Sequence, residues 1–93
     1  MVMLITIDEA KLFLRLDSNN EDTLIESLIL TSQSICEDIL RVKIIELEVI
    51  PETLKIAILY GTTYLYENRE TANHADLIKT LTSLLFGIRR EMF

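Results

Sequence analysis

The sequence predicts an all-α fold, a small bundle of about four helices, from three observations. Glycine and proline are scarce, with two and one among 93 residues. Apolar residues recur at spacings of three and four in several segments, which is the periodicity of one helix face. Leu, Ile, Glu, Lys and Ala dominate these segments and favour helix or buried packing. A chain of this length makes one domain, so residues 1–93 are expected to share a single core.

A short first helix is expected over about residues 7–14. Thr6 and Glu9 have the spacing of a capping box, in which each side chain accepts a hydrogen bond from the backbone N–H of the other residue. The predicted apolar face of this helix comprises Ala10, Phe13 and Leu14, with Leu16 just beyond. The polar run at residues 17–20 should end it and supply the N-cap of the next helix.

A long second helix is expected over residues 21–41. Its apolar positions are Leu24, Ile25, Leu28, Ile29, Ile35, Cys36, Ile39 and Leu40. Its predicted solvent face carries Glu21, Asp22, Glu26, Gln33, Glu37 and Asp38. As the only cysteine, Cys36 excludes an intrachain disulfide and is expected to be a small core residue, which fits a reducing environment.

The third helix should begin at Pro51, because proline is tolerated in the first turn of a helix. Residues 56–66 carry no charge, and a helix that is apolar on every side must be covered on every side. The segment therefore predicts a central helix with further burial against neighbouring subunits. Its core stripe is predicted to be Leu54, Ile58, Gly61 and Leu65, widened by Ala57, Tyr64 and, on the flank, Tyr60. A helical glycine costs about 1 kcal/mol relative to alanine, so we expect another helix to approach Gly61 closely.

The remaining segments are a connection and a fourth helix. Residues 42–50 are rich in β-branched side chains and predict a short extended segment or a loop. Leu77, Ile78, Leu81, Leu84, Leu85 and Ile88 then predict a helix that ends near Arg90. The Arg89-Arg90 pair would stabilise the negative end of that helix or contact an acidic partner. His74 falls in a loop or N-cap position before it.

The sequence offers little that resembles chemistry, so the protein is predicted not to be an enzyme and to bind no cofactor. One histidine and one cysteine cannot supply the four ligands of a structural zinc site. The neighbouring Glu37 and Asp38 point about 100° apart on a helix, which favours a solvated face over a catalytic pair. A net charge of −6 disfavours a surface that tracks nucleic-acid phosphates. No apolar run approaches the ~20 residues of a membrane span, and the amino terminus lacks the features of a signal peptide.

The polar end of the third helix is the candidate site. It is open to two interpretations: a solvated helix end with local ion pairs, or the polar rim of a buried interface, where arginine is enriched. The tyrosines are expected in the core or a subunit interface, since no basic groove accompanies them as in a base-stacking platform. The predicted subunit-interface residues are Tyr60, Tyr64, Tyr66, Glu67, Arg69 and Glu70.

The order of these segments resembles one family. Its amino-terminal signature is similar to Ile5-Thr-Ile-Asp-Glu-Ala-Lys-Leu-Phe-Leu-Arg-Leu-Asp17, followed by Asp22-Thr-Leu-Ile25-Glu-Ser-Leu-Ile29. A second signature resembles Pro51-Glu-Thr-Leu-Lys-Ile-Ala-Ile-Leu with Tyr66-Glu-Asn-Arg-Glu70, and Leu84-Leu-Phe-Gly-Ile-Arg-Arg resembles its carboxy-terminal helix. The family is that of the tailed-phage head–tail connectors, which act as head-completion or adaptor proteins after DNA packaging. Many members have a glycine-containing turn where this chain has residues 42–50 without glycine.

The resemblance implies a virion structural protein of a phage or prophage, present in the host cytoplasm during assembly. Members form a homo-oligomeric ring, usually twelve-fold in the particle, that lies below the portal protein and extends the DNA channel towards the tail. The implied partners are the portal and a tail-completion or stopper protein, while DNA passes without specific binding. The alternative is a small dimeric bacterial interaction or regulatory module with a two-fold interface on the third helix. The number of subunits separates these two hypotheses.

Overall fold

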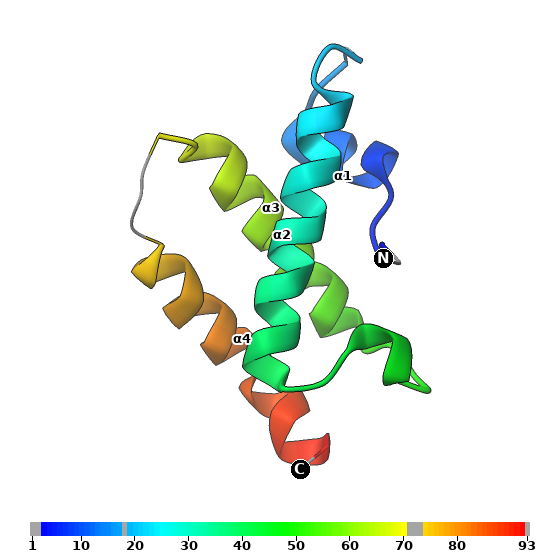
Figure 1. Ribbon diagram of the computed structural model, residues 1–93, viewed down its shortest axis with the longest axis vertical. Coiled ribbons are helices and arrows are strands. Elements are labelled where there is room, and N and C mark those ends of the chain that lie inside the picture. The colour runs from blue at the N-terminus through cyan, green and yellow to red at the C-terminus, as the bar shows by residue number, and fades with distance from the viewer. Residues whose placement is uncertain (1–2, 18, 71–73, 93) are drawn as a thin grey trace.

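A computed structural model describes residues 3–17, 19–70 and 74–92, with the side chains of residues 89–92 excepted. The described residues form four α-helices and one turn of 3-10 helix, and they contain no strand. The helices are α1 (Ile7–Leu14), α2 (Asp22–Leu40), α3 (Glu52–Glu67) and α4 (Ala75–Met92), and the 3-10 turn is η1 (Ile44–Glu46) (Figure 1). The all-α prediction is confirmed, as are the four predicted helices to within a few residues.

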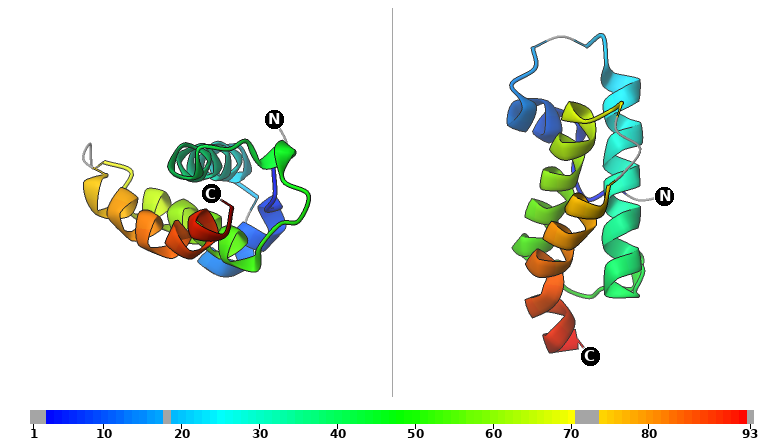
Figure 2. Two further views of the ribbon diagram at one scale, coloured as in Figure 1. Left: turned by 90° about the horizontal axis from the view of Figure 1, so that it is seen from below. Right: turned by 90° about the vertical axis from the view of Figure 1, so that its left-hand side faces the viewer.

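The two long central helices organise the bundle. α2 and α3 each contact all three of the other helices. α1 and α4 lie on opposite sides of α3, and α2 packs across the same face of all three (Figure 2). The α1–α2 turn lies at one end of the bundle, and the segment that carries η1 lies towards the other end (Figure 1).

The core is made of aliphatic side chains from every helix. The residues with no exposed surface include Ile25, Ile29, Leu54, Ile58, Leu77, Leu81 and Leu85. Each such side chain contributes about 1.5–3 kcal/mol relative to full exposure. Cys36 is fully buried among them, as predicted.

The predicted close approach of a helix to Gly61 is confirmed. A Cβ at this position would overlap the hydroxyl of Ser32 on α2 and would lie 3.1 Å from the Ser32 Cβ. The Ser32 hydroxyl donates a 2.8 Å hydrogen bond to the carbonyl of Ile58, one turn before the glycine. The missing side chain of Gly61 therefore lets α2 lie directly against the backbone of α3.

The predicted apolar face of α1 is wrong at Phe13, which is exposed, whereas Ala10 is buried and Leu14 and Leu16 are partly buried. Lys11 is buried instead. Its ammonium group lies 3.1 Å from the Asp22 carboxylate and also donates to the side chain of Asn19. A lysine stem can cover apolar surface while its charge is paired at the edge of that surface. This explains why Lys11 can be buried on α1 although Phe13 is exposed.

The predicted solvent face of α2 is wrong at two positions, because Gln33 and Glu37 are buried. The Gln33 amide oxygen accepts from the backbone N–H of Leu4 at 3.0 Å, and Glu37 Oε2 accepts from the N–H of Ile44 at 2.8 Å. Backbone donors outside regular helices need acceptors when they are covered. These two side chains supply them, one for the amino-terminal segment and one for η1.

Two further expectations about segment ends need correction. The N-cap of α2 is Glu21 rather than a residue of the run 17–20, and its side chain makes no cap hydrogen bond. Pro51 is the N-cap of α3, and the helix begins at Glu52. The segment 42–50, for which the sequence predicts an extended segment or a loop, contains the single turn η1 and has extended geometry at the flanking Lys43 and Leu47.

Candidate subunit interface

The predicted interface residues lie along the second half of α3 and in the turn that follows it. Tyr64 is half-buried against the core, and its ring meets that of His74 edge-on, with centroids 6.2 Å apart. The backbone carbonyl of Tyr64 also accepts from the Asn68 side chain at 2.9 Å. His74 lies directly before α4, as predicted, and its carbonyl accepts from the N–H of Ile78. The structure therefore gives Tyr64 a role within the subunit, in joining α3 to the start of α4.

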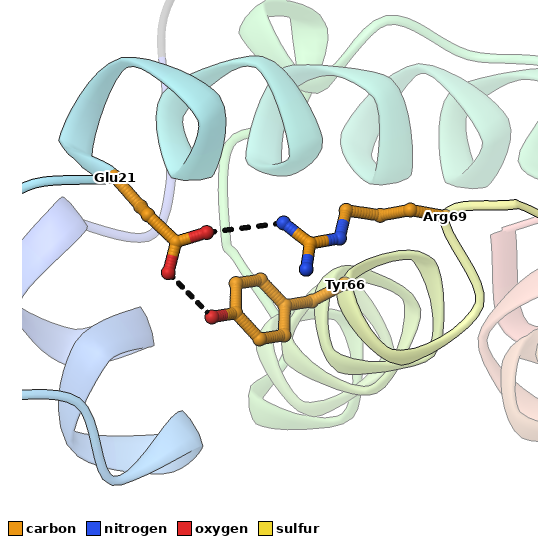
Figure 3. A network of polar contacts seen from close by, with 3 residues as sticks. All are labelled: Glu21, Tyr66 and Arg69. Atoms are coloured by element: carbon orange, nitrogen blue, oxygen red, sulfur yellow. Dashed lines mark hydrogen bonds and ion pairs between the residues drawn. The ribbon is translucent and has the colours of Figure 1, made fainter.

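Tyr66 and Arg69 meet a residue that the sequence did not single out (Figure 3). The Tyr66 hydroxyl donates to Glu21 Oε1 at 2.7 Å, and Arg69 Nη1 donates to Glu21 Oε2 at 3.0 Å. The Arg69 guanidinium also lies over the Tyr66 ring, 4.7 Å from its centroid, at the range of a cation–π contact. One carboxylate thus joins the amino-terminal end of α2 to the carboxy-terminal end of α3.

This contact favours the ionised carboxylate and the neutral phenol. The hydrogen bond from Tyr66, with that from Arg69 and the arginine charge, lowers the pKa of Glu21 against a smaller opposing effect of burial. The same hydrogen bond to Glu21 raises the pKa of Tyr66. The hydrogen bond is therefore most favourable at neutral pH, where the Glu21 carboxylate is charged and the Tyr66 phenol is not.

The end of α3 forms an open polar hollow. An open cavity of about 330 Å³ is lined by Tyr66, Glu67, Asn68, Arg69 and Glu70. Glu67 and Glu70 are exposed at its rim. The hollow offers charged groups to a partner, and the hydroxyl of Tyr66 in its lining is held by the Glu21 carboxylate.

Tyr60 lies apart from this cluster, on the outer face of α3. It is 39% exposed, and Ile56, one turn earlier on the same face, is 54% exposed. The other α3 faces pack on α2, α1 and α4. The subunit therefore leaves an apolar strip of its central helix uncovered. Four of the six predicted residues, Tyr66, Glu67, Arg69 and Glu70, line the neighbouring polar hollow.

The described residues offer little else for chemistry. Burial raises the pKa of the Cys36 thiol to about 12, with a further contribution from the charge of Glu37. In the part of the chain that the structure describes, no group of three or more His, Cys, Asp or Glu side chains is arranged to hold a metal ion. None of the described helices combines the length and apolar character that crossing a membrane requires. The side chains of Arg89 and Arg90 lie outside the described residues.

Sequence reasoning missed Glu21 as a member of this site. It placed the residue on the solvent face of α2, and the structure shows it half-buried between two helices. The partner is 45 residues away, and helical periodicity carries no information on pairs at that separation. The available signal was the polar cluster at the end of α3, whose arginine and tyrosine needed an acceptor.

Comparison with known proteins identifies one family. A family model described as phage gp6-like head-tail connector protein matches residues 4–92. No curated protein and no solved structure matches the chain. The matched range extends over all four helices, so the similarity covers the whole bundle rather than one motif.

Proposed function

The chain belongs to the phage gp6-like head-tail connector family, and from this premise we propose that it forms a ring at the head–tail junction of a phage particle. Family membership supports a structural role in the virion. In the proposed ring, of twelve subunits by analogy with the family, the protein lies below the portal and extends the DNA channel towards the tail. It has no catalytic activity, and it assembles in the host cytoplasm.

The observation that carries the ring proposal is the incomplete cover of α3. This helix is central, yet Ile56 and Tyr60 remain exposed on its outer face. Exposed apolar side chains that gather on one face indicate a protein–protein contact. A small domain buries a modest share of its surface alone, so neighbouring copies add substantially to its stability.

We further propose that the polar end of α3 is part of this subunit contact. Tyr60, Glu67 and Glu70 are available to a neighbour, and Arg69 keeps part of its guanidinium exposed while it binds Glu21. Tyr64 and Tyr66 support this surface from within the subunit. The remaining partners are the portal and a tail-completion or stopper protein. A net charge of −6 suits a channel through which DNA passes without specific binding, because like charges repel.

Native mass spectrometry over a concentration series into the millimolar range tests the proposal. A closed oligomer of about a dozen subunits supports the ring. A dimer that persists at every concentration contradicts it and favours a two-fold interaction module. If the protein alone is monomeric, the same measurement is made with the portal protein present. Assembly on the portal then supports the proposal, and absence of any complex contradicts it.

A further inference from the structure

Apolar side chains stand exposed on both lateral edges of the bundle. One edge is formed by α4 and the carboxy-terminal end of α3, on the left in Figure 1. It exposes Ile78 (47%) and Phe86 (58%). The opposite edge is formed by α1 and residues 42–50, on the right in Figure 1. It exposes Ile45 (79%) and Val49 (78%), besides Leu12 and Phe13 on α1.

Two unlike edges are what a cyclic assembly needs. A two-fold dimer pairs one patch with its own copy, whereas a ring joins two different patches of the same chain head to tail. In a closed ring, neighbouring copies are related by rotation alone. Patches that meet must therefore lie at the same height along the ring axis.

The edges match in height when the ring axis runs along the bundle. α1 lies level with the end of α3, near one end of the molecule, and residues 42–50 lie level with the middle of α4 (Figures 1 and 2).

The exposed tip of residues 42–50 is held in a defined shape. Glu37, which is buried on α2, accepts from the N–H of Ile44 at 2.8 Å, and the carbonyl of Lys43 accepts from the N–H of Glu46 at 2.9 Å. Ile44 itself is buried in the core. Ile45 and Val49 therefore project from an anchored turn, and less conformational entropy is lost when such a preorganised segment binds.

We propose that residues 42–50 of one copy dock, through Ile45 and Val49, on the outer face of α4 of the next copy. The same arrangement brings α1 of the first copy beside the carboxy-terminal end of α3 of the second. This contact rests on the proposed ring. It adds to that proposal the surface against which the α3–α4 edge packs in a neighbouring copy, namely α1 and residues 42–50.

Paramagnetic relaxation in mixed samples tests this contact even when the free protein associates weakly. A nitroxide is attached at Glu48→Cys, beside the docking side chains, and the labelled chain is mixed at millimolar concentration with isotope-labelled wild-type protein. The label reacts at the new cysteine because Cys36 is fully buried. The expected result is loss of amide peak intensity along α4 of the wild-type chain, with recovery when the nitroxide is reduced. A label at Lys79→Cys should reciprocally broaden residues 42–50.

Two variants provide the matched comparison. Val49→Asp should abolish the broadening of α4, and Ser34→Asp, which places the same charge on the exposed face of α2, should leave it unchanged. Broadening of residues 42–50 by the label at position 48 would show a two-fold contact and overturn the proposal. Broadening confined to other elements, or none, would overturn it as well. If mass spectrometry shows a closed ring but α4 is not broadened, the ring stands and only this contact is wrong. If α4 is broadened but no closed oligomer forms, with or without the portal, the contact stands and only the ring is wrong.

Discussion

Glu21 accepts a hydrogen bond from the Tyr66 hydroxyl at 2.7 Å, although the two residues are 45 positions apart. Glu21 is the N-cap residue of α2, and its side chain makes no bond to the first turn of its own helix. Its carboxylate reaches Tyr66 and Arg69 instead. Here it connects α2 to the end of α3, the region proposed to face a neighbouring subunit.

This contact predicts a pH-dependent effect of Tyr66→Phe. The pKa of Glu21 is lowered from 4.5, so the stabilisation is present above that pH and is lost as the pH falls through the lower, folded-state pKa. The pKa of Tyr66 is raised from 10.0, so the stabilisation is present below that pH and is lost as the pH rises through the folded-state value. The variant should therefore be less stable than wild type between these limits, and the difference should shrink at both extremes.

Denaturant unfolding of both proteins across this pH range measures the difference. Because the groups are solvent-accessible, the effect is expected to be small. A difference that stays constant from acid to alkaline pH would mean that the hydroxyl contributes through packing and not through Glu21. Glu21→Gln provides the control. Without the carboxylate, the stability difference made by Tyr66→Phe should no longer change at acidic pH, and its change at alkaline pH should be weak.

Arg69→Glu is expected to weaken ring assembly more than it weakens folding. The change places two carboxylates together where Arg69 Nη1 and Glu21 Oε2 now lie 3.0 Å apart, which costs some stability. Exposed ion pairs contribute little to folding, so most of the loss should appear in assembly. Native mass spectrometry and thermal unfolding of the same sample compare the two effects.

The charge-swapped double variant Glu21→Arg/Arg69→Glu separates the intrachain role from the intersubunit one. It should recover the stability lost in Arg69→Glu without recovering assembly. Recovery of both properties would show that Arg69 acts only through Glu21, and the proposed subunit contact at this residue would then be wrong.

The two glycines should respond in opposite directions to alanine. Gly61→Ala would force a Cβ into the Ser32 hydroxyl, and overpacking of this kind typically costs about 1–3 kcal/mol, more than the gain of about 1 kcal/mol in helix propensity. At Gly87, also within a helix, an added Cβ meets nothing within 4 Å. Gly87→Ala should therefore stabilise the protein by about 0.5–1 kcal/mol. Equal effects of the two substitutions in denaturant unfolding would exclude a close approach of α2 to Gly61.

Helical periodicity was sufficient to predict the bundle and the core of α3, because each core stripe is a local pattern. The stripe Leu54, Ile58, Gly61 and Leu65 is buried as predicted. What periodicity could not supply is which polar residue meets a backbone donor from a distant segment. Gln33 and Glu37 were assigned to solvent by their polarity alone, and both are buried because a non-helical N–H lies against them.

In the candidate site, too, only the features that follow from a local sequence pattern could be predicted. The polar end of α3 was visible as a cluster of charges after an uncharged run, and five of its residues do line one hollow. Glu21 was invisible because the fold, not the local sequence, brings it there. The apolar edges were also hidden: Phe13 was assigned to the core, and Ile45 and Val49 belong to a segment without a clear period.

Cys36 should be inert towards thiol reagents at neutral pH while the protein is folded. It has no exposed surface, and burial raises its pKa to about 12, so almost no reactive thiolate is present. Alkylation followed by mass spectrometry should show modification only at the rate of unfolding, against rapid modification in denaturant. Fast labelling of the folded protein would show that the α2 core opens locally.

Glu37→Ala is expected to release the segment 42–50 without unfolding the bundle. The substitution removes the acceptor of the Ile44 N–H, and a buried donor left without a partner costs about 1–3 kcal/mol. Because the loss is confined to η1 and its flanks, hydrogen exchange of the Ile44 amide should accelerate far more than that of amides in the middle of α2. Glu37→Gln keeps an oxygen acceptor of the same reach and should retain most of the protection at Ile44. Uniform acceleration along α2 in Glu37→Ala would contradict this role, since it would mean that Glu37 supports the core and not the turn.

If the segment docks on a neighbouring copy as proposed, the same alanine variant should also weaken that contact, because Ile45 and Val49 would no longer project from an anchored turn.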